Sequence, residues 1–251
     1  MAIRAVVFDL FDTLVDLRGE DLPLMEHRGE RIPASVKKLH AMVSTQADVD
    51  LDDFIDAFEA GARAFAESHL SQGREVTTFD RFTDLLARIG LVDADLAERV
   101  TQVHMGVLRS AVRVPEHHAS VLDALKARVD IGLCSNFSHS ETALGILDES
   151  GFAPRLDAIV VSDAFGLRKP RAEIFDEVLY RLGVGRDEVI HVGDSLRADV
   201  GGAGPLGIRT VWITRRVRDP ESRLREHTGH RPDHAIADLA ELPAILDRLG
   251  A

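Results

Sequence analysis

Short apolar runs alternate with amphipathic stretches over most of the chain, and this alternation predicts an α/β fold. The runs at 3–8, 129–134, 158–162, 189–192 and 209–213 have the length and composition of buried strands. Because helical patterns separate the later runs, we expect right-handed crossovers and a doubly wound, Rossmann-like parallel sheet. The expected helices of this core lie near residues 118–127, 138–149, 172–182, 198–206 and 239–249.

A long insertion separates the first strand of the core from the second. Residues 17–33 are polar and contain Gly and Pro, which predicts a linker, and residues 114–117 form a second linker. The stretch between them predicts four amphipathic helices, at 35–44, 51–70, 79–89 and 94–112. We therefore expect a core of residues 1–16 and 114–251 and an all-α insertion of residues 17–113. Because no strand is expected to join the two linkers, the insertion should move relative to the core.

The composition limits the partners that the chain can have. With 251 residues, 45% of them hydrophobic, the chain can bury the core of one large domain or of two. Its formal net charge of −12 argues against nucleic acid and anionic membranes, which bind basic surfaces. The single cysteine, Cys134, lies in an apolar strand and predicts a buried, unreactive thiol. Since neither a signal peptide nor an apolar run of membrane-spanning length is visible, we expect a cytoplasmic monomer or homodimer that acts on a small molecule.

The segment FDLFDTLVD, residues 8–16, places a carboxylate directly after the first buried strand. In open α/β sheets, ligands bind outside the carboxyl ends of the strands, so Asp9 should point into that crevice. Thr13 and Asp16 follow at short spacing. Asp is also favoured in turns, and this motif alone does not separate a turn residue from an active-site carboxylate.

Two later segments bring polar groups to the same edge of the predicted sheet. In LCSNFSHS, the strand at 129–134 is followed by Ser135 and Asn136, and Ser138 is placed to cap the next helix. A hydroxyl, an amide and a helix N-terminus together favour an anion. In GLRKPRAEIF, Lys169 precedes a proline at the start of an amphipathic helix, which brings an ammonium group to this edge.

A third segment adds two carboxylates. In VIHVGDSLRADVGGA, the strand at 189–192 is followed by Gly193 and Asp194, and Asp199 lies five residues further on. Each of these polar residues has an ordinary structural interpretation as a helix start, a solvated charge or a turn residue. Their occurrence in order, at the ends of strands or the starts of helices of one sheet, favours a shared site instead.

With these four segments, the chain resembles the haloacid dehalogenase-like (HAD) hydrolase superfamily. The motifs occur in order as DLFDT at Asp9, Ser135 after the next core strand, Lys169 before Pro170, and GDSLRAD at Asp194. The resemblance covers essentially the whole chain. It implies an α/β core with a helical cap inserted after the first motif and a hydrolase activity, although a fold does not determine the substrate.

The resemblance and the residue chemistry together predict phosphoryl hydrolysis that uses Mg²⁺. Asp9 is expected to attack phosphorus and to form an aspartyl-phosphate. Asp9 and Asp194 would hold the cation, and Asp199 would bind or orient one of its water ligands. The family resemblance adds the backbone carbonyl of Phe11 to these metal ligands.

Polar groups around Asp9 are expected to bind a small phosphorylated metabolite. Ser135 and the neighbouring amides would hold the transferring group, whose charge is spread over three oxygens. Lys169 would offset the remaining charge and keep Asp9 ionised. The residues expected to bind the substrate are Thr13, Ser135, Asn136 and Lys169.

One position departs from the phosphatases of this superfamily, in which a second Asp two residues after the nucleophile acts as general acid and base. Here that position is Phe11; Asp12 lies three residues on, where an extended backbone would turn it to the opposite face, so it is interpreted as a turn residue. A missing general acid typically costs about 10² to 10⁴ in rate. We therefore expect a substrate with a good leaving group, such as an acyl phosphate or anhydride, or an acid supplied by the cap or the substrate.

Two alternatives to a phosphatase remain open. An aromatic residue at position 11 resembles the haloacid dehalogenase branch, in which a carboxylate attacks carbon and halide leaves without a proton. Those enzymes need no metal, whereas GDSLRAD keeps both acidic positions. The second alternative is a phosphate-binding protein with impaired catalysis. In the first linker, His27, Arg28 and Arg31 could reach the site if a cap closes over it.

Other features of the core are interpreted as structural. The glycines of 198–206 indicate either close packing of a helix on a strand or a short frayed helix. The segment 215–231 carries six arginines and is interpreted as a solvated flap, with an oligomer contact as the alternative. Phe175, Tyr180 and Trp212 lie in predicted core elements and are interpreted as packing residues.

Overall fold

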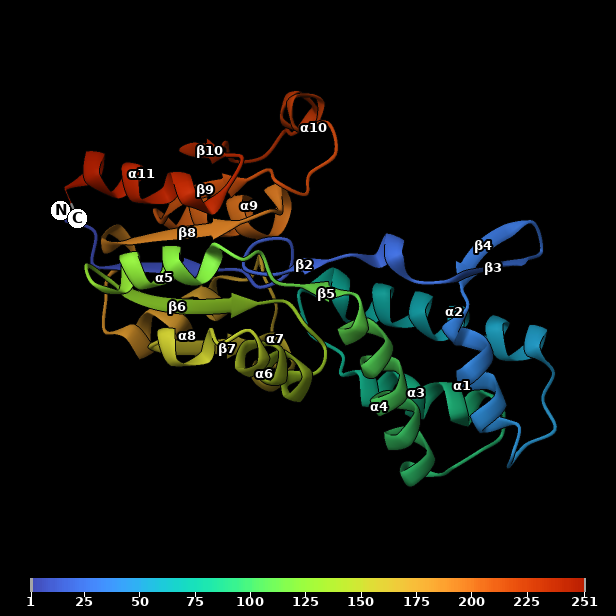
Figure 1. Ribbon diagram of the computed structural model, residues 1–251. Helices are drawn as coiled ribbons and strands as arrows, with labels where there is room; N and C mark the ends of the chain where they lie inside the picture. The colour runs from blue at the N-terminus through green and yellow to red at the C-terminus, as the bar shows by residue number, and fades with distance from the viewer. Residues whose placement is uncertain (1, 251) are drawn as a thin grey trace. The chain divides into compact units, whose positions relative to one another are not determined.

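The computed structural model describes residues 2–250 and divides into two compact units (Figure 1). One unit contains the chain up to Asp16 and from Arg113 onward, and the other contains Leu17–Val112. Each unit has a hydrophobic core of its own. Within the described residues, no helix is both long enough and apolar enough to cross a membrane.

The first unit is built on a six-stranded parallel sheet, which confirms the predicted doubly wound, Rossmann-like core. The strand order is β10-β9-β8-β1-β6-β7. The strands are β1 (Ala5–Phe8), β6 (Asp130–Ser135), β7 (Ala158–Val161), β8 (Val189–Gly193), β9 (Arg209–Ile213) and β10 (His234–Ile236). The chain adds β6 and β7 on one side of β1 and then β8, β9 and β10 on the other. Such a reversal of strand order opens a crevice at the carboxyl ends of the strands.

Helices cover both faces of this sheet (Figure 1). The helices α5 (His118–Lys126) and α11 (Leu242–Leu249) pack together over one face, and α8 (Ala172–Leu182) packs with the short α9 (Gly201–Ala203) over the other. Because both faces are covered, all four residues of β1 are buried. Two further helices, α6 (Ser140–Glu149) and the short α7 (Ser162–Phe165), follow β6 and β7.

The helix predicted at 198–206 is present but irregular. It begins as a π turn, η5 (Leu196–Val200), continues as α9, and ends in a 3-10 turn, η6 (Gly204–Leu206). A Cβ atom on Gly202 would lie only 2.7 Å from the ring of Phe175. Gly202 therefore allows close packing, as one interpretation of these glycines expected, but its neighbour is the helix α8 and not a strand.

Two surface features of this unit differ from the sequence-based expectation. The arginine-rich segment contains a short helix, α10 (Pro220–Glu226), whose N-cap Asp219 accepts a hydrogen bond from the Ser222 amide at 3.2 Å. Tyr180 was expected to pack in the core, but it lies on the solvent side of α8 and is 83% exposed. The prediction for Tyr180 was wrong because the apolar stripe of α8 runs along the opposite face of that helix.

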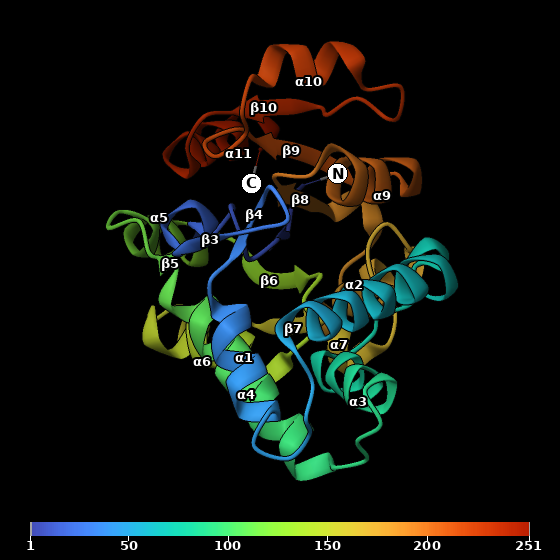
Figure 2. The ribbon, with the colours of Figure 1, turned by 90° about the vertical axis from the view of Figure 1, so that its right-hand side faces the viewer.

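The second unit contains the four predicted helices (Figure 2). They are α1 (Ser35–Val43), α2 (Leu51–Ser68), α3 (Thr78–Arg88) and α4 (Ala94–Ser110). The side chains of Asp50, Thr77 and Asp93 accept hydrogen bonds from backbone amides of α2, α3 and α4, which defines where these helices begin. Apolar residues of all four helices form the core of the unit.

The predicted linker at 17–33 contains regular structure, contrary to expectation. It forms a 3-10 turn, η1 (Gly19–Asp21), and a hairpin of β3 (Leu24–His27) and β4 (Glu30–Pro33). The hairpin turn is Arg28-Gly29, with φ angles of 48° and 81°. Such turns usually carry Asn or Asp before Gly, so an Arg-Gly turn is hard to recognise as a hairpin from sequence.

The two segments that connect the units pair with each other as short strands. These strands are β2 (Asp16–Leu17) and β5 (Val112–Arg113), and they form a two-stranded sheet. This pairing was not predicted, because two residues are too few to show an alternating pattern.

Candidate active site

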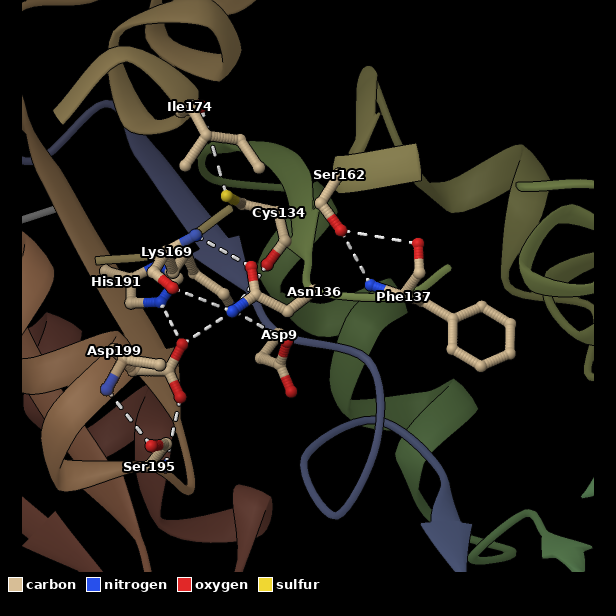
Figure 3. A network of polar contacts seen from close by, with 11 residues as sticks. Asp9, Cys134, Asn136, Phe137, Ser162, Lys169, Ile174, His191, Ser195 and Asp199 are labelled. Carbon is tan, nitrogen blue, oxygen red and sulfur yellow. Dashed lines mark hydrogen bonds and ion pairs between the residues drawn. The ribbon is translucent and has the colours of Figure 1, made fainter. Parts of the chain in front are cut away.

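Lys169 lies at the centre of a buried polar network at the carboxyl end of β1 (Figure 3). Asp9 follows β1 directly, and its amide donates to the carbonyl of Val192 at 2.9 Å. Lys169 Nζ donates to Asp9 Oδ1 at 2.6 Å, to Asp199 Oδ1 at 2.7 Å and to the carbonyl of Cys134 at 2.6 Å. The structure therefore brings together three residues that lie far apart in the sequence.

Asn136 positions the backbone of Lys169. Its Nδ2 donates to the Lys169 carbonyl at 2.9 Å, and its Oδ1 accepts from the Lys169 amide at 2.7 Å. From its sequence position, Asn136 was expected to bind the substrate. In the structure, its amide is engaged by Lys169, so Asn136 acts on the site through the position of that lysine.

Asp199 is held by three donors and a close backbone approach. Besides Lys169, His191 Nε2 donates to Oδ1 at 2.8 Å, and the Ser195 amide donates to Oδ2 at 3.0 Å. A Cβ atom on Gly193 would lie 2.2 Å from the Asp199 carboxyl carbon, so this position requires glycine. His191 was not among the predicted site residues, because a lone polar residue inside an apolar strand resembles a core residue.

The protonation states of the network follow from burial and mutual charge. Burial raises the pKa of Asp9 to about 6, although Lys169 opposes the shift. Burial would lower the pKa of Lys169, but the charges of Asp199 and Asp9 outweigh it and raise that pKa. Burial also opposes ionisation of Asp199, but the charge of Lys169 outweighs it, so the pKa of Asp199 is lowered. At neutral pH, Asp9 is therefore mostly ionised beside a protonated Lys169.

Asp194 adds a third carboxylate to this site. It follows β8, and its backbone carbonyl accepts a hydrogen bond from Trp212 Nε1 at 2.7 Å. Three carboxylate oxygens, one from each of Asp9, Asp194 and Asp199, lie within 4.8 Å of one another. Within residues 2–250, the Asp194 carboxylate makes no hydrogen bond or ion pair. Burial and then the charge of Asp9 raise the pKa of Asp194 to about 8.

This donor set fits a hard divalent cation. Three carboxylates surround one ammonium group, and the ammonium contacts only two of them. Carboxylate oxygens are the ligands that Mg²⁺ and similar ions prefer. A cation beside Asp194 would give this half-buried carboxylate the ion pair that it does not form with any described residue.

Two buried hydroxyl groups near the carboxyl end of β1 have no partner among the described residues. Ser135, the last residue of β6, is 1% exposed, and Thr13 is completely buried. Buried hydroxyl groups normally form hydrogen bonds, so both are available to a ligand or a water molecule. Ser138 does not cap α6 as expected; His139 does so instead, through its Nδ1 atom, which accepts from the Thr142 amide at 3.2 Å.

Phe11 is part of an aromatic pair. Its ring lies against that of Phe137, with centroids 4.8 Å apart. The next residue, Asp12, has a φ of 54°, and its carboxylate lies 3.6 Å from the Arg216 guanidinium group. Asp12 is therefore a turn residue with a cationic neighbour, as expected, and position 11 offers no proton.

The polar residues of the first linker lie in the helical unit, where they pair locally. Arg28 contacts Asp56 at 2.6 Å and Asp52 at 3.2 Å, and His27 Nδ1 lies 3.6 Å from Asp52. Arg31 is exposed on β4. The guanidinium group of Arg28 is therefore engaged by carboxylates of its own unit.

The geometry agrees with the chain's similarity to known proteins. The chain belongs to the haloacid dehalogenase-like hydrolases, because a sequence model of that family matches residues 3–207. A phosphoserine phosphatase from Thermus thermophilus is 27% identical over 96% of this chain and 98% of its own length. A ribulose-1,5-bisphosphate 5-phosphatase from Halopiger xanaduensis is 30% identical over 53% of this chain, and the match spans only 56% of that protein.

Solved structures share the fold over almost the whole chain. A 2-haloacid dehalogenase from Pseudomonas syringae has a TM-score of 0.68 and 21% identity, with 98% of this chain and 99% of that one covered. The HAD-hydrolase YfnB from Bacillus subtilis, solved with magnesium bound, has a TM-score of 0.60 and 22% identity, with 98% and 100% covered. At these identities, the structures establish the fold alone.

Proposed function

We propose that this chain hydrolyses a small phosphorylated metabolite with the help of Mg²⁺, through an aspartyl-phosphate on Asp9. The observation that carries the proposal is the Asp194 carboxylate, which is part of a cluster of three acids and forms no hydrogen bond or ion pair within residues 2–250. Full-length similarity to a phosphoserine phosphatase supports the same reaction class.

In this proposal, Asp9 and Asp194 hold the cation together with the backbone carbonyl of Phe11. When bound, the cation polarises the phosphoryl group and reduces the repulsion between that group and the Asp9 carboxylate, which are both anionic. Asp199 is engaged by Lys169 and His191, so its main role is to position Lys169, and it can also orient a water ligand of the cation.

The reaction proceeds in two displacements at phosphorus. In the first, an Asp9 oxygen forms a bond to phosphorus while the bond to the leaving group breaks, and the leaving group takes the electron pair. In the second, water attacks the same phosphorus, and Asp9 and inorganic phosphate are released. Lys169 and the Ser135 hydroxyl group stabilise the phosphoryl oxygens during both displacements.

The leaving group has to depart without a proton from position 11, because Phe11 is packed against Phe137. We therefore propose an acyl phosphate, an anhydride or another substrate with a stable leaving anion. We further propose that residues 17–112 act as a cap that excludes water during the first displacement.

Hydrolysis of a 2-haloacid is the second candidate, and the Phe11–Phe137 pair is the observation that favours it. Attack on carbon releases halide, which needs no general acid. Asp194 argues against this reaction, because a third carboxylate beside Asp9 would repel an anionic haloacid unless a cation is present.

The test is an assay of phosphate esters, acyl phosphates and 2-haloacids, each with Mg²⁺ and with a chelator. We expect release of phosphate from the acyl phosphates that requires Mg²⁺. Release of halide in the presence of chelator would overturn the proposal and show that the protein is a 2-haloacid dehalogenase. Binding of phosphate without turnover of any compound would favour a phosphate-binding protein.

A further inference from the structure

A cavity of about 540 Å³ opens beside Asp194 in the α/β unit. Its wall includes Trp212, whose Nε1 atom donates a hydrogen bond to the backbone carbonyl of Asp194 at 2.7 Å. Basic side chains from η5, from the segment after β9 and from α10 line the cavity. They are Arg197, Arg216, Arg218, Arg223 and His227. The cavity and the candidate active site thus share Asp194.

The charge of this cavity is opposite to that of the chain. Four guanidinium groups line it together with two carboxylates, those of Asp194 and Glu226, whereas the chain carries a net charge of −12. Within residues 2–250, the guanidinium groups of Arg197, Arg218 and Arg223 form no hydrogen bond or ion pair. These arginines therefore add nothing to the fold through ion pairs, and their positive charge is available to a ligand.

The loop that carries these arginines is anchored to the fold. The Val217 amide donates to the Thr214 carbonyl at 2.9 Å, and Asp219 caps α10. At the other end of the loop, His227 Nε2 lies 3.1 Å from the His230 carbonyl oxygen. The segment interpreted from sequence as a solvated flap thus places three of its six arginines, Arg216, Arg218 and Arg223, around one cavity.

We infer that this cavity binds a second oxyanion of the substrate, a carboxylate or a further phosphate, at the end remote from the phosphoryl group that Asp9 attacks. The inference rests on the proposed function, because it assigns the other part of the same substrate. Guanidinium groups match both oxyanions through paired hydrogen bonds. The volume lies within the range of small-molecule sites and admits part of a carbon skeleton with the anion. The substrate is therefore a phosphorylated compound with two anionic ends.

Matched aryl phosphates test this inference, because phenolates leave without strong need of a general acid. One pair is 4-carboxyphenyl phosphate and its neutral amide, 4-carbamoylphenyl phosphate. The other pair is 1,4-phenylene bisphosphate and 4-methoxyphenyl phosphate. For each pair, the measured quantity is the ratio of kcat/KM, counted per phosphoryl group, for the anionic probe to that for the neutral probe, with Mg²⁺ present.

We expect the wild-type ratio to exceed one for at least one pair. The double variant R218A/R223A should lower that ratio about 10-fold or more, because the second anion loses the charge-assisted hydrogen bonds of two guanidinium groups. The variant R225A is the matched control, because Arg225 lies on the same helix but does not line the cavity. It should keep the wild-type ratio. A ratio is measured within one preparation, so partial unfolding does not affect it.

The outcomes separate the inference from the proposed function. Hydrolysis of the probes with wild-type ratios of one or less, or with a ratio unchanged in R218A/R223A, overturns the inference and leaves the phosphohydrolase standing. Absence of hydrolysis of all four probes overturns the inference, and the acyl phosphates, assayed beside them, decide whether the phosphohydrolase stands. A raised ratio for only one pair supports the inference and identifies the second anion as carboxylate or as phosphate.

Discussion

Lys169 and Asp9 form a buried ion pair across 160 residues of sequence, with Nζ and Oδ1 2.6 Å apart. The same ammonium group also contacts Asp199, so one cation serves two buried carboxylates. Removing one partner of a buried pair leaves an uncompensated charge, which is far more costly than losing a surface ion pair.

Lys169→Met should therefore destabilise the protein by about 3–5 kcal/mol and abolish turnover. Urea unfolding, followed by circular dichroism, measures the first effect. Lys126→Met is the matched control, because Lys126 pairs with Asp157 at the surface, where ion pairs contribute about 0–1 kcal/mol. Equal losses of stability in the two variants would show that the Lys169 network is not a stabilising element.

Asp9→Asn should abolish hydrolysis while the fold is kept, because an amide has the shape of a carboxylate but is no nucleophile. Asp12→Asn is the control: Asp12 has a positive φ, which Asn tolerates well, and this variant should retain most activity. Steady-state rates with the best phosphate substrate measure both. If Asp9→Asn kept more than about a hundredth of the wild-type rate, Asp9 would not be the covalent catalyst.

Asp194→Asn should weaken Mg²⁺ binding by an order of magnitude or more, since it removes a charged ligand from the carboxylate cluster. Isothermal titration calorimetry measures the affinity directly, without any substrate. Asp187→Asn removes an equally charged but exposed side chain after α8 and should leave the affinity unchanged. Unaltered binding in Asp194→Asn would exclude Asp194 from the metal site.

Phe11→Asp should restore a general acid and raise activity toward poor leaving groups, such as sugar phosphates, by up to about 10² to 10⁴. The gain is reduced by the loss of the contact with the Phe137 ring and by the need to satisfy a new carboxyl group. Phe11→Asn removes the same ring contact without adding an acid, so its activity toward these substrates should not rise. If a folded, metal-binding Phe11→Asp variant hydrolyses no ester faster than wild type, the missing acid does not explain the choice of substrate.

The helical unit should lose stability as the pH falls below about 6.5, the ordinary pKa of histidine. Burial lowers the pKa of His104, and the charge of Arg81 lowers it further. In the window below pH 6.5, the unfolded chain therefore binds a proton that the folded chain does not, and unfolding becomes more favourable. Thermal midpoints between pH 8 and pH 5 measure this dependence.

His104→Phe should reduce the acid-induced drop of the midpoint, because Phe retains an aromatic ring against Phe82 but cannot ionise. His69→Phe, at the end of α2, is the control for the loss of one imidazole. Identical pH profiles in wild type and His104→Phe would assign the acid sensitivity to other groups.

Sequence pattern predicted the residues at strand ends well, because a polar side chain after a buried strand has few structural reasons to be there. Asp9, Ser135 and Asp194 each directly follow or end such a strand, and Lys169 joins them in the structure. Tertiary hydrogen bonds could not be predicted in the same way. The role of Asn136 depends on the backbone of a residue 33 positions away, and that of His191 on a carboxylate across a tight turn.

Short elements were missed for a related reason. The strand β10 has three residues and the hairpin β3–β4 turns on Arg28-Gly29, so neither carries enough periodicity or turn chemistry to be distinguished from loop. Tertiary context determines both, through pairing with β9 in the first case and pairing within the hairpin in the second.

Cys134 gives the protein a useful property for spectroscopy. It is the single cysteine of the chain, it is fully buried in β6, and burial raises the pKa of its thiol to about 12. Thiol-directed reagents attack the thiolate, so the native protein should remain unlabelled under mild conditions. A cysteine introduced on an exposed helix of each unit would then accept a spin label or a dye selectively. Distances between the two labels, with and without a phosphate analogue, would follow the two units in solution.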